Sequence, residues 1–127
     1  MAKQSICMNR ILIVDDEPAI CQLGQRVLTV RGFEVETAAN GKVALSKISE
    51  REYGLYLFDI KMPLMDGKEL FELLKKTYPG SAERVVFTTG SALGAETEGF
   101  LQNCGRPVLR KPFTISQLRE VVEEFLK

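Results

Sequence analysis

The chain has 127 residues, of which 45% are apolar and 27% charged, and its 17 Lys plus Arg residues balance 17 Asp plus Glu residues. This length suits one compact domain with its own core, and the zero net charge gives no support for sequence-independent binding to nucleic acid or to an acidic membrane. The chain contains no histidine, so proton transfer at neutral pH or Ser/Cys–His catalysis within it would need other groups.

The first predicted strand is the run Ile11–Val14, which stops at two aspartates. A continuous apolar run fits a strand that is buried on both faces, as in a parallel sheet. Pro18 then suits the first position of a helix, and the helical spacing of apolar residues continues as far as Gly32. Residues 33–39 alternate between apolar and polar, which predicts a second strand nearer an edge of the sheet.

The middle of the chain repeats this order of helix and strand. Residues 42–51 read as a helix, and the apolar run 54–59 predicts a third strand that ends on an aspartate. Asp66 before Gly67 is most simply a turn and a helix N-cap, and the helix that follows is broken at Pro79.

Residues 84–90 predict a fourth strand, which ends in two threonines and a glycine. Residues 91–105 contain three glycines, so the helix expected there should be short and mobile. A short fifth strand falls within 107–113, and an amphipathic helix with Thr114 as its N-cap closes the chain.

Five strands therefore alternate with five helices, the pattern of an α/β protein with helices on both faces of a parallel sheet. We expect residues 1–9 to form an N-terminal tail and residues 10–127 to form the domain.

Polar side chains stand where four of these strands end. Because the carboxyl ends of parallel strands share one edge of a sheet, we expect these groups to meet in a crevice there. They are Asp15, Asp16, Asp59, Thr88, Thr89 and Lys111. Two or three carboxylates in one place need a hard cation, and oxygen ligands favour Mg²⁺.

This arrangement would let Asp59 act as a nucleophile towards a phosphoryl group, whose oxygens the metal, a hydroxyl and an ammonium then neutralise. Each motif also has a simpler structural interpretation when taken alone. An Asp-Asp pair is typical of a helix cap, and Pro63 shapes a loop. The functional interpretation depends on all of these residues converging at one sheet edge.

The three cysteines, Cys7, Cys21 and Cys104, are widely spaced and odd in number, which fits neither a disulfide framework nor a zinc site. No apolar run approaches the roughly 18 residues of a membrane span, and residues 1–10 lack the apolar stretch of a signal peptide. We therefore expect a cytoplasmic protein that does not associate with a membrane.

Four segments together resemble the motifs of the response-regulator receiver domains of two-component signalling. They are "ILIVDDEP", "LYLFDIKMPLMDG", "VVFTTG" and "LRKPF", in that order and with the spacing of that family. The resemblance spans residues 10–126. It implies a flavodoxin-like α/β fold with a doubly wound, five-stranded parallel sheet in the order 2-1-3-4-5 and five helices.

The resemblance implies a magnesium site around the phosphoacceptor, Asp59. The carboxylates of Asp16 and Asp59 would ligate Mg²⁺ directly and Asp15 mainly through water. The backbone carbonyl of Lys61 would supply a further oxygen.

On the other side of the phosphoryl group, the resemblance places the Thr89 hydroxyl and the Lys111 ammonium against its oxygens. Gly90 would leave the backbone open beside the site. The bond between Lys111 and Pro112 would be a cis peptide, which only an X-Pro bond reaches at low cost.

Glu17 and Lys61 flank Asp59 at the mouth of the site. They are either solvated charges or groups that shield the aspartyl phosphate from water and so tune its lifetime. Lys61 also bears on the alternative function, a Mg²⁺-dependent phosphatase or phosphotransferase with an aspartyl-phosphate intermediate. Such enzymes typically need a second acid at that position, and they need a cap over the substrate.

The implied function is signalling. The domain would take its phosphoryl group from a histidine of a sensor kinase or phosphotransfer protein, and it would catalyse only its own phosphorylation and slow autodephosphorylation. The phosphorylated state would alter binding to a downstream protein target or a covalently linked output domain through the 91–126 face, without direct contact to nucleic acid. The chain would be either a stand-alone regulator or a fragment of a larger regulator or hybrid kinase. The segment "GRPVLRKPF" resembles the receivers of hybrid sensor kinases as much as those of stand-alone regulators.

One position departs from the family. Many receivers carry an aromatic residue where this chain has Val108, and that ring turns inward on phosphorylation. Valine has no ring to turn, so we expect the response to fall on the 91–105 segment and on the 106–126 face.

Overall fold

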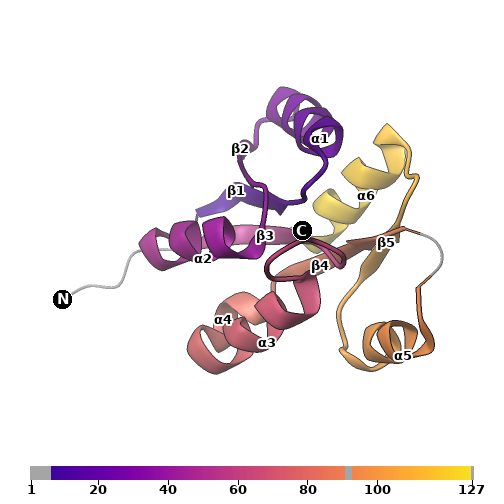
Figure 1. The fold of residues 1–127 in the computed structure, drawn as a ribbon. Helices are drawn as coiled ribbons and strands as arrows, with labels where there is room; N and C mark the ends of the chain where they lie inside the picture. Colours follow the sequence, from indigo (N-terminus) through magenta and orange to yellow (C-terminus); the bar gives the residue numbers. More distant parts are fainter. Residues whose placement is uncertain (1–6, 91–92, 127) are drawn as a thin grey trace.

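The computed structural model describes residues 7–90 and 93–126, and it contains one five-stranded sheet (Figure 1). All strand pairs are parallel, and the order across the sheet is β2-β1-β3-β4-β5. The strands are β1 (Cys7–Val14), β2 (Glu34–Ala38), β3 (Tyr53–Asp59), β4 (Val85–Thr89) and β5 (Val108–Arg110). The predicted doubly wound sheet and its strand order are confirmed.

Helices cover both faces of the sheet, with α1 and α6 on one face and α2, α3 and α5 on the other (Figure 1). The helices of the described residues are α1 (Pro18–Val30), α2 (Gly41–Glu50), α3 (Gly67–Thr77), α4 (Pro79–Ala82), α5 (Ala95–Asn103) and α6 (Ile115–Phe125). In this part of the chain, no helix is both long enough and apolar enough to cross a membrane.

The unbroken apolar run of β3 follows from this double covering. Leu55 and Leu57 face the core beneath α1 and α6, whereas Tyr56 and Phe58 face the core beneath α2, α3 and α5. Every residue of β3 is buried as a result, including Asp59 at its end. A strand with two apolar faces can therefore hold a carboxylate rigidly at the edge of the sheet.

Side-chain caps begin the helices at two of the expected residues. Asp66 accepts a hydrogen bond from the Glu69 amide, and Thr114 accepts one from the Gln117 amide, each within a reciprocal capping box. The predicted caps at these two residues are confirmed.

The structure corrects the helix count from five to six among the described residues. The extra helix, α4, is a single turn that begins at Pro79, where the sequence predicted only a break. Proline both ends a preceding helix and presets the backbone angle of a new one, so one residue does both here. β1 also begins at Cys7, so the strand takes in the last three residues of the predicted 1–9 tail.

Candidate functional site

The strand ends bring the predicted site residues to one edge of the sheet. The register pairs Val14 with Phe58, Asp59 with Thr88, and Thr89 with Arg110. The next residues along β1 and β5 are Asp15 and Lys111, so all four strands deliver a polar group to the same place.

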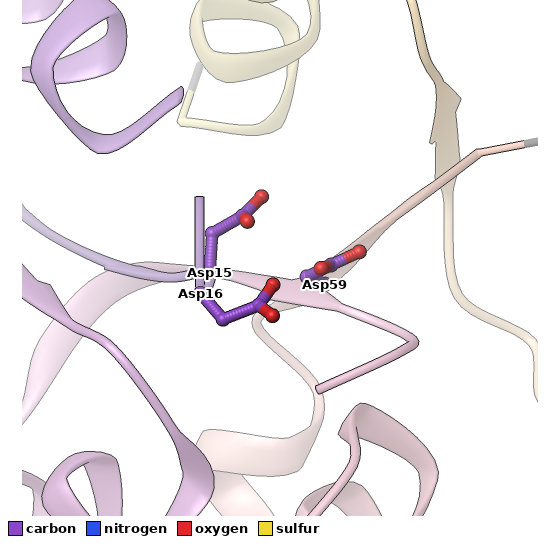
Figure 2. A group of neighbouring side chains, drawn as sticks. All are labelled: Asp15, Asp16 and Asp59. Carbon is purple, nitrogen blue, oxygen red and sulfur yellow. The ribbon is translucent and has the colours of Figure 1, made fainter. Parts of the chain in front are cut away.

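Three carboxylates form the centre of the site. Asp15, Asp16 and Asp59 each offer an oxygen, and these atoms lie within 4.8 Å of one another (Figure 2). Asp15 and Asp59 are 2% and 5% exposed, whereas Asp16 faces solvent. Two buried negative charges at this separation repel each other strongly, so the cluster calls for a cation.

Lys111 supplies one positive charge from the end of β5. Its Nζ lies 2.9 Å from Asp15 Oδ2, 3.5 Å from Asp59 Oδ1 and 2.7 Å from Glu17 Oε1. Burial lowers the pKa of this ammonium, but the three surrounding carboxylates outweigh burial, and the pKa is raised above its ordinary value. Lys111 therefore stays charged throughout the working pH range.

One ammonium does not neutralise the cluster. Burial raises the pKa of Asp59 from 3.8 to about 7, and the negative charge of Asp15 adds to the effect while Lys111 opposes it. Asp15 Oδ1 accepts a hydrogen bond of 2.9 Å from the Glu17 amide, which orients this carboxylate. Asp15 Oδ2 is buried and accepts no well-aligned hydrogen bond from the described residues, although the Lys111 ammonium lies nearby.

A divalent cation fits this donor set. The ligands on offer are carboxylate oxygens, one of them buried without a hydrogen bond, and such hard oxygen donors suit Mg²⁺ better than a soft metal. The residues that would hold the ion are the three aspartates of the cluster.

Thr89 and Gly90 lie at the end of β4 beside the cluster. The Thr89 side chain is buried, and its hydroxyl donates a 3.3 Å hydrogen bond to the Gly90 carbonyl. A Cβ placed on Gly90 would meet no atom within 4 Å, so this stretch of backbone is open. The Lys111–Pro112 peptide bond is cis, as the sequence resemblance implied.

The loop after Asp59 folds back onto the sheet. The Ile60 amide donates to the Thr88 carbonyl at 2.9 Å, and the Gly67 amide donates to the Ile60 carbonyl at 3.1 Å. Gly67 has to be glycine, because a Cβ there would clash with the Asp59 carbonyl oxygen. The Lys61 side chain is exposed on this loop, two residues after Asp59.

Sequence reasoning placed Glu17 at the mouth of the site but missed its contact with Lys111. These residues are 94 positions apart, and no local spacing in the sequence predicts that they meet. It also missed Cys21, whose thiol donates a 3.4 Å hydrogen bond to the Asp15 carbonyl, and burial raises the pKa of that thiol. A helical spacing of four residues from Glu17 to Cys21 was the available signal.

Fold and site together define a flavodoxin-like α/β protein with a cluster of three carboxylates at the carboxyl edge of its sheet. The family model of the response regulator receiver domain matches residues 11–123. The chain belongs to this family of two-component signalling domains, which bind Mg²⁺ in an acidic pocket and are generally signalling modules without an enzymatic activity of their own.

Similar proteins include both kinases and separate regulators. The sensor kinase CckA of Brucella abortus is 35% identical over 119 residues, a match that covers 92% of this chain but only 12% of the length of the kinase. A CheY-like response regulator receiver domain protein from Methanospirillum hungatei is 40% identical, with a TM-score of 0.82 and 92% of each chain covered. The signal receiver domain of a histidine kinase from Syntrophus aciditrophicus is 28% identical, with a TM-score of 0.82 and coverage of 92% of this chain and 89% of that one.

Proposed function

We propose that this domain is a phosphoacceptor in which Asp59 takes a phosphoryl group from a histidine of a sensor kinase or phosphotransfer protein. The observation that carries the proposal is the position of Asp59, which is 5% exposed at the sheet edge and has the partly buried ammonium of Lys111 3.5 Å from its Oδ1. A carboxylate in this setting is held still and faces the incoming group.

In the proposed step, an Asp59 oxygen attacks the phosphorus atom and forms the new P–O bond. The P–N bond to the donor histidine breaks, and its electron pair returns to the ring nitrogen, which is neutral after transfer from a protonated phosphohistidine. The Lys111 ammonium would balance negative charge on the phosphoryl oxygens, and the Thr89 hydroxyl would donate a hydrogen bond to one of them. Mg²⁺, held by the three aspartates and the Lys61 carbonyl, would supply further charge neutralisation when it is bound.

Lys61 supports a signalling role over the alternative of a phosphatase or phosphotransferase. The side chain two residues after the nucleophile is an exposed ammonium, so it offers no carboxylic acid for protonating a leaving group. On this proposal the domain catalyses only its own phosphorylation and slow dephosphorylation. Lys61 and Glu17 would tune the lifetime of the phosphorylated state.

The output of the phosphorylated state would be altered binding to a protein target or a linked output domain. We place this response on the face formed by α5, β5 and α6, which follows Thr89 directly in the chain. The 91–126 face proposed from the sequence includes residues 91 and 92, which lie outside the described residues. No contact with nucleic acid forms part of the proposal.

The test is phosphorylation by a small phosphodonor such as acetyl phosphate, with and without Mg²⁺, followed by intact-mass measurement. We expect a single phosphoryl adduct on the wild-type protein with Mg²⁺, little adduct without it, and none on Asp59→Asn. Asp66→Asn is the matched control, because this aspartate of the same loop is a helix cap and asparagine caps equally well. A wild type that stays unmodified, or an Asp59→Asn protein that is modified equally, would overturn the proposal.

A further inference from the structure

The Lys111 ammonium is shared unequally among three carboxylates. The shortest contact is with Glu17, at 2.7 Å, and the longest is with Asp59, at 3.5 Å. Among the described residues, Glu17 accepts a well-aligned hydrogen bond from the ammonium, whereas Asp15 and Asp59 lie near it as ion-pair partners. The aligned hydrogen bond of Lys111 is therefore made to Glu17 and not to Asp59, the residue whose phosphoryl group it is expected to contact.

The Glu17 side chain makes no capping hydrogen bond to its own helix. Glu17 is the N-cap residue of α1, but its carboxylate caps no backbone amide. The local hydrogen bonds are made by its backbone, which donates to Asp15 and accepts from Ile20 and Cys21. Replacing the carboxylate would therefore leave the start of α1 intact.

We propose that Glu17 is a positioning residue that holds the Lys111 ammonium by a hydrogen bond until phosphorylation, so that Glu17 and the phosphoryl group on Asp59 compete for one ammonium. The inference rests on the proposed function of Asp59 as phosphoacceptor. To reach a phosphoryl oxygen on Asp59, the ammonium gives up its contact with Glu17. Glu17 thereby slows phosphorylation and sets how strongly Lys111 holds the phosphorylated state.

This role differs from general repulsion of the anionic phosphodonor by a negative charge at the mouth. Glu17 is 58% exposed, so a field effect on the donor is the competing explanation. Glu17→Asp separates the two, because it keeps the charge but is one methylene too short for the same contact. Glu17→Gln removes the charge while keeping the shape.

The experiment compares wild type with Glu17→Gln, Glu17→Asp and a control, Glu98→Gln. Glu98 forms a 3.1 Å ion pair with Arg110, the neighbour of Lys111, so the control removes a nearby acid that does not touch the ammonium. The first measurement is the ¹³C NMR relaxation of the Lys111 ε-methylene in metal-free protein. The second is the initial rate of phosphorylation by acetyl phosphate with Mg²⁺.

We expect the Lys111 ε-methylene to become more mobile in both Glu17 variants and to stay unchanged in Glu98→Gln. Both Glu17 variants should be phosphorylated about two- to fivefold faster, the range that loss of a partly exposed ion pair supports. A faster rate in Glu17→Gln alone would assign the effect to repulsion of the donor, and unchanged or slower rates in both would also overturn the inference. A wild type that takes no phosphoryl group would instead overturn the function of Asp59, and with it this role for Glu17.

Discussion

Asp59→Asn should stabilise the metal-free protein, although it removes the proposed phosphoacceptor. Asp59 is 5% exposed and shares its pocket with the buried Asp15, so its ionised form is a cost to the folded state. Asparagine has nearly the same shape and no charge. We expect Lys111 to keep its contacts with Asp15 and Glu17 in the variant, which are 2.9 and 2.7 Å long in the wild-type protein.

The size of the effect follows from the pKa of Asp59, which burial and the charge of Asp15 raise from 3.8 to about 7. One pKa unit corresponds to about 1.4 kcal/mol, so full ionisation of Asp59 costs the folded state about 4 kcal/mol. Asp59→Asn removes this cost but recovers only part of it as added stability, because the asparagine amide is a weaker acceptor for the Lys111 ammonium than a carboxylate is. We therefore expect a rise of about 2–4 kcal/mol in the free energy of unfolding, or roughly 10 °C in Tm.

The sign of the pH dependence is the reverse of that for a salt-bridged aspartate. Because the folded-state pKa lies above the unfolded value, the folded protein keeps the Asp59 proton after the unfolded chain has lost it. The contribution of Asp59 to stability therefore falls as the pH rises from about 4 to about 7, and it is constant outside that window. The gain from Asp59→Asn should be complete at pH 8 and nearly absent at pH 4.

Urea unfolding in EDTA, followed by circular dichroism at pH 8 and pH 4, measures both the gain in the free energy of unfolding and its dependence on pH. Asp66→Asn is again the control, and its stability should match that of wild type at each pH, since asparagine preserves the cap. Added Mg²⁺ should stabilise wild type more than Asp59→Asn. A variant that is less stable than wild type at pH 8, or equally stabilised at both pH values, would refute the electrostatic reasoning.

Other changes test the supports of the site. Tyr56→Phe should cost about 1–3 kcal/mol in urea unfolding, because it leaves the buried Tyr53 amide without its 3.2 Å acceptor. Gly67→Ala should cost about 2 kcal/mol and lower the phosphorylation rate, because its Cβ pushes on the Asp59 carbonyl. Lys111→Met should cost about 3 kcal/mol in EDTA and less in Mg²⁺, because two buried carboxylates lose their cation. Hydrogen exchange should be faster in α5 than in α6, because α5 has no side-chain cap and contains Gly99, whereas Thr114 caps α6; equal protection of the two helices would contradict this reasoning.

The fold was predictable because its signals are local and repeated. A run such as Leu55–Phe58 is apolar at every position, which only a strand with helices on both faces requires. Once parallel strands are inferred, their carboxyl ends must share an edge, so the meeting of Asp15 and Asp59 follows from topology. Capping residues such as Asp66 and Thr114 marked helix starts for the same local reason.

What the sequence did not reveal depends on contacts between distant segments. The ion pair of Glu17 with Lys111 joins the start of α1 to the end of β5, and an isolated glutamate carries no sign of it. The extension of β1 back to Cys7 is of the same kind, because Cys7 reaches Tyr53 only across a shift in register. The turn of α4 was hidden because Pro79 signals the end of one helix and the start of another with equal strength.

The way α5 is attached to the rest of the domain does not depend on an aromatic residue at position 108, where this chain has a valine. No side chain caps the helix at Gly94, Gly99 interrupts its interior, and Phe100 packs edge to face against Phe71 and Phe87. Val108 packs against this same core, where the rings of α3, β4 and α5 already meet. Side chains of β4 therefore contact α5 directly, through Phe87 two residues before Thr89, and this contact involves no residue of β5. A helix that lacks a side-chain cap and has a glycine in its interior is displaced at low cost, so we expect the response to phosphorylation to include α5.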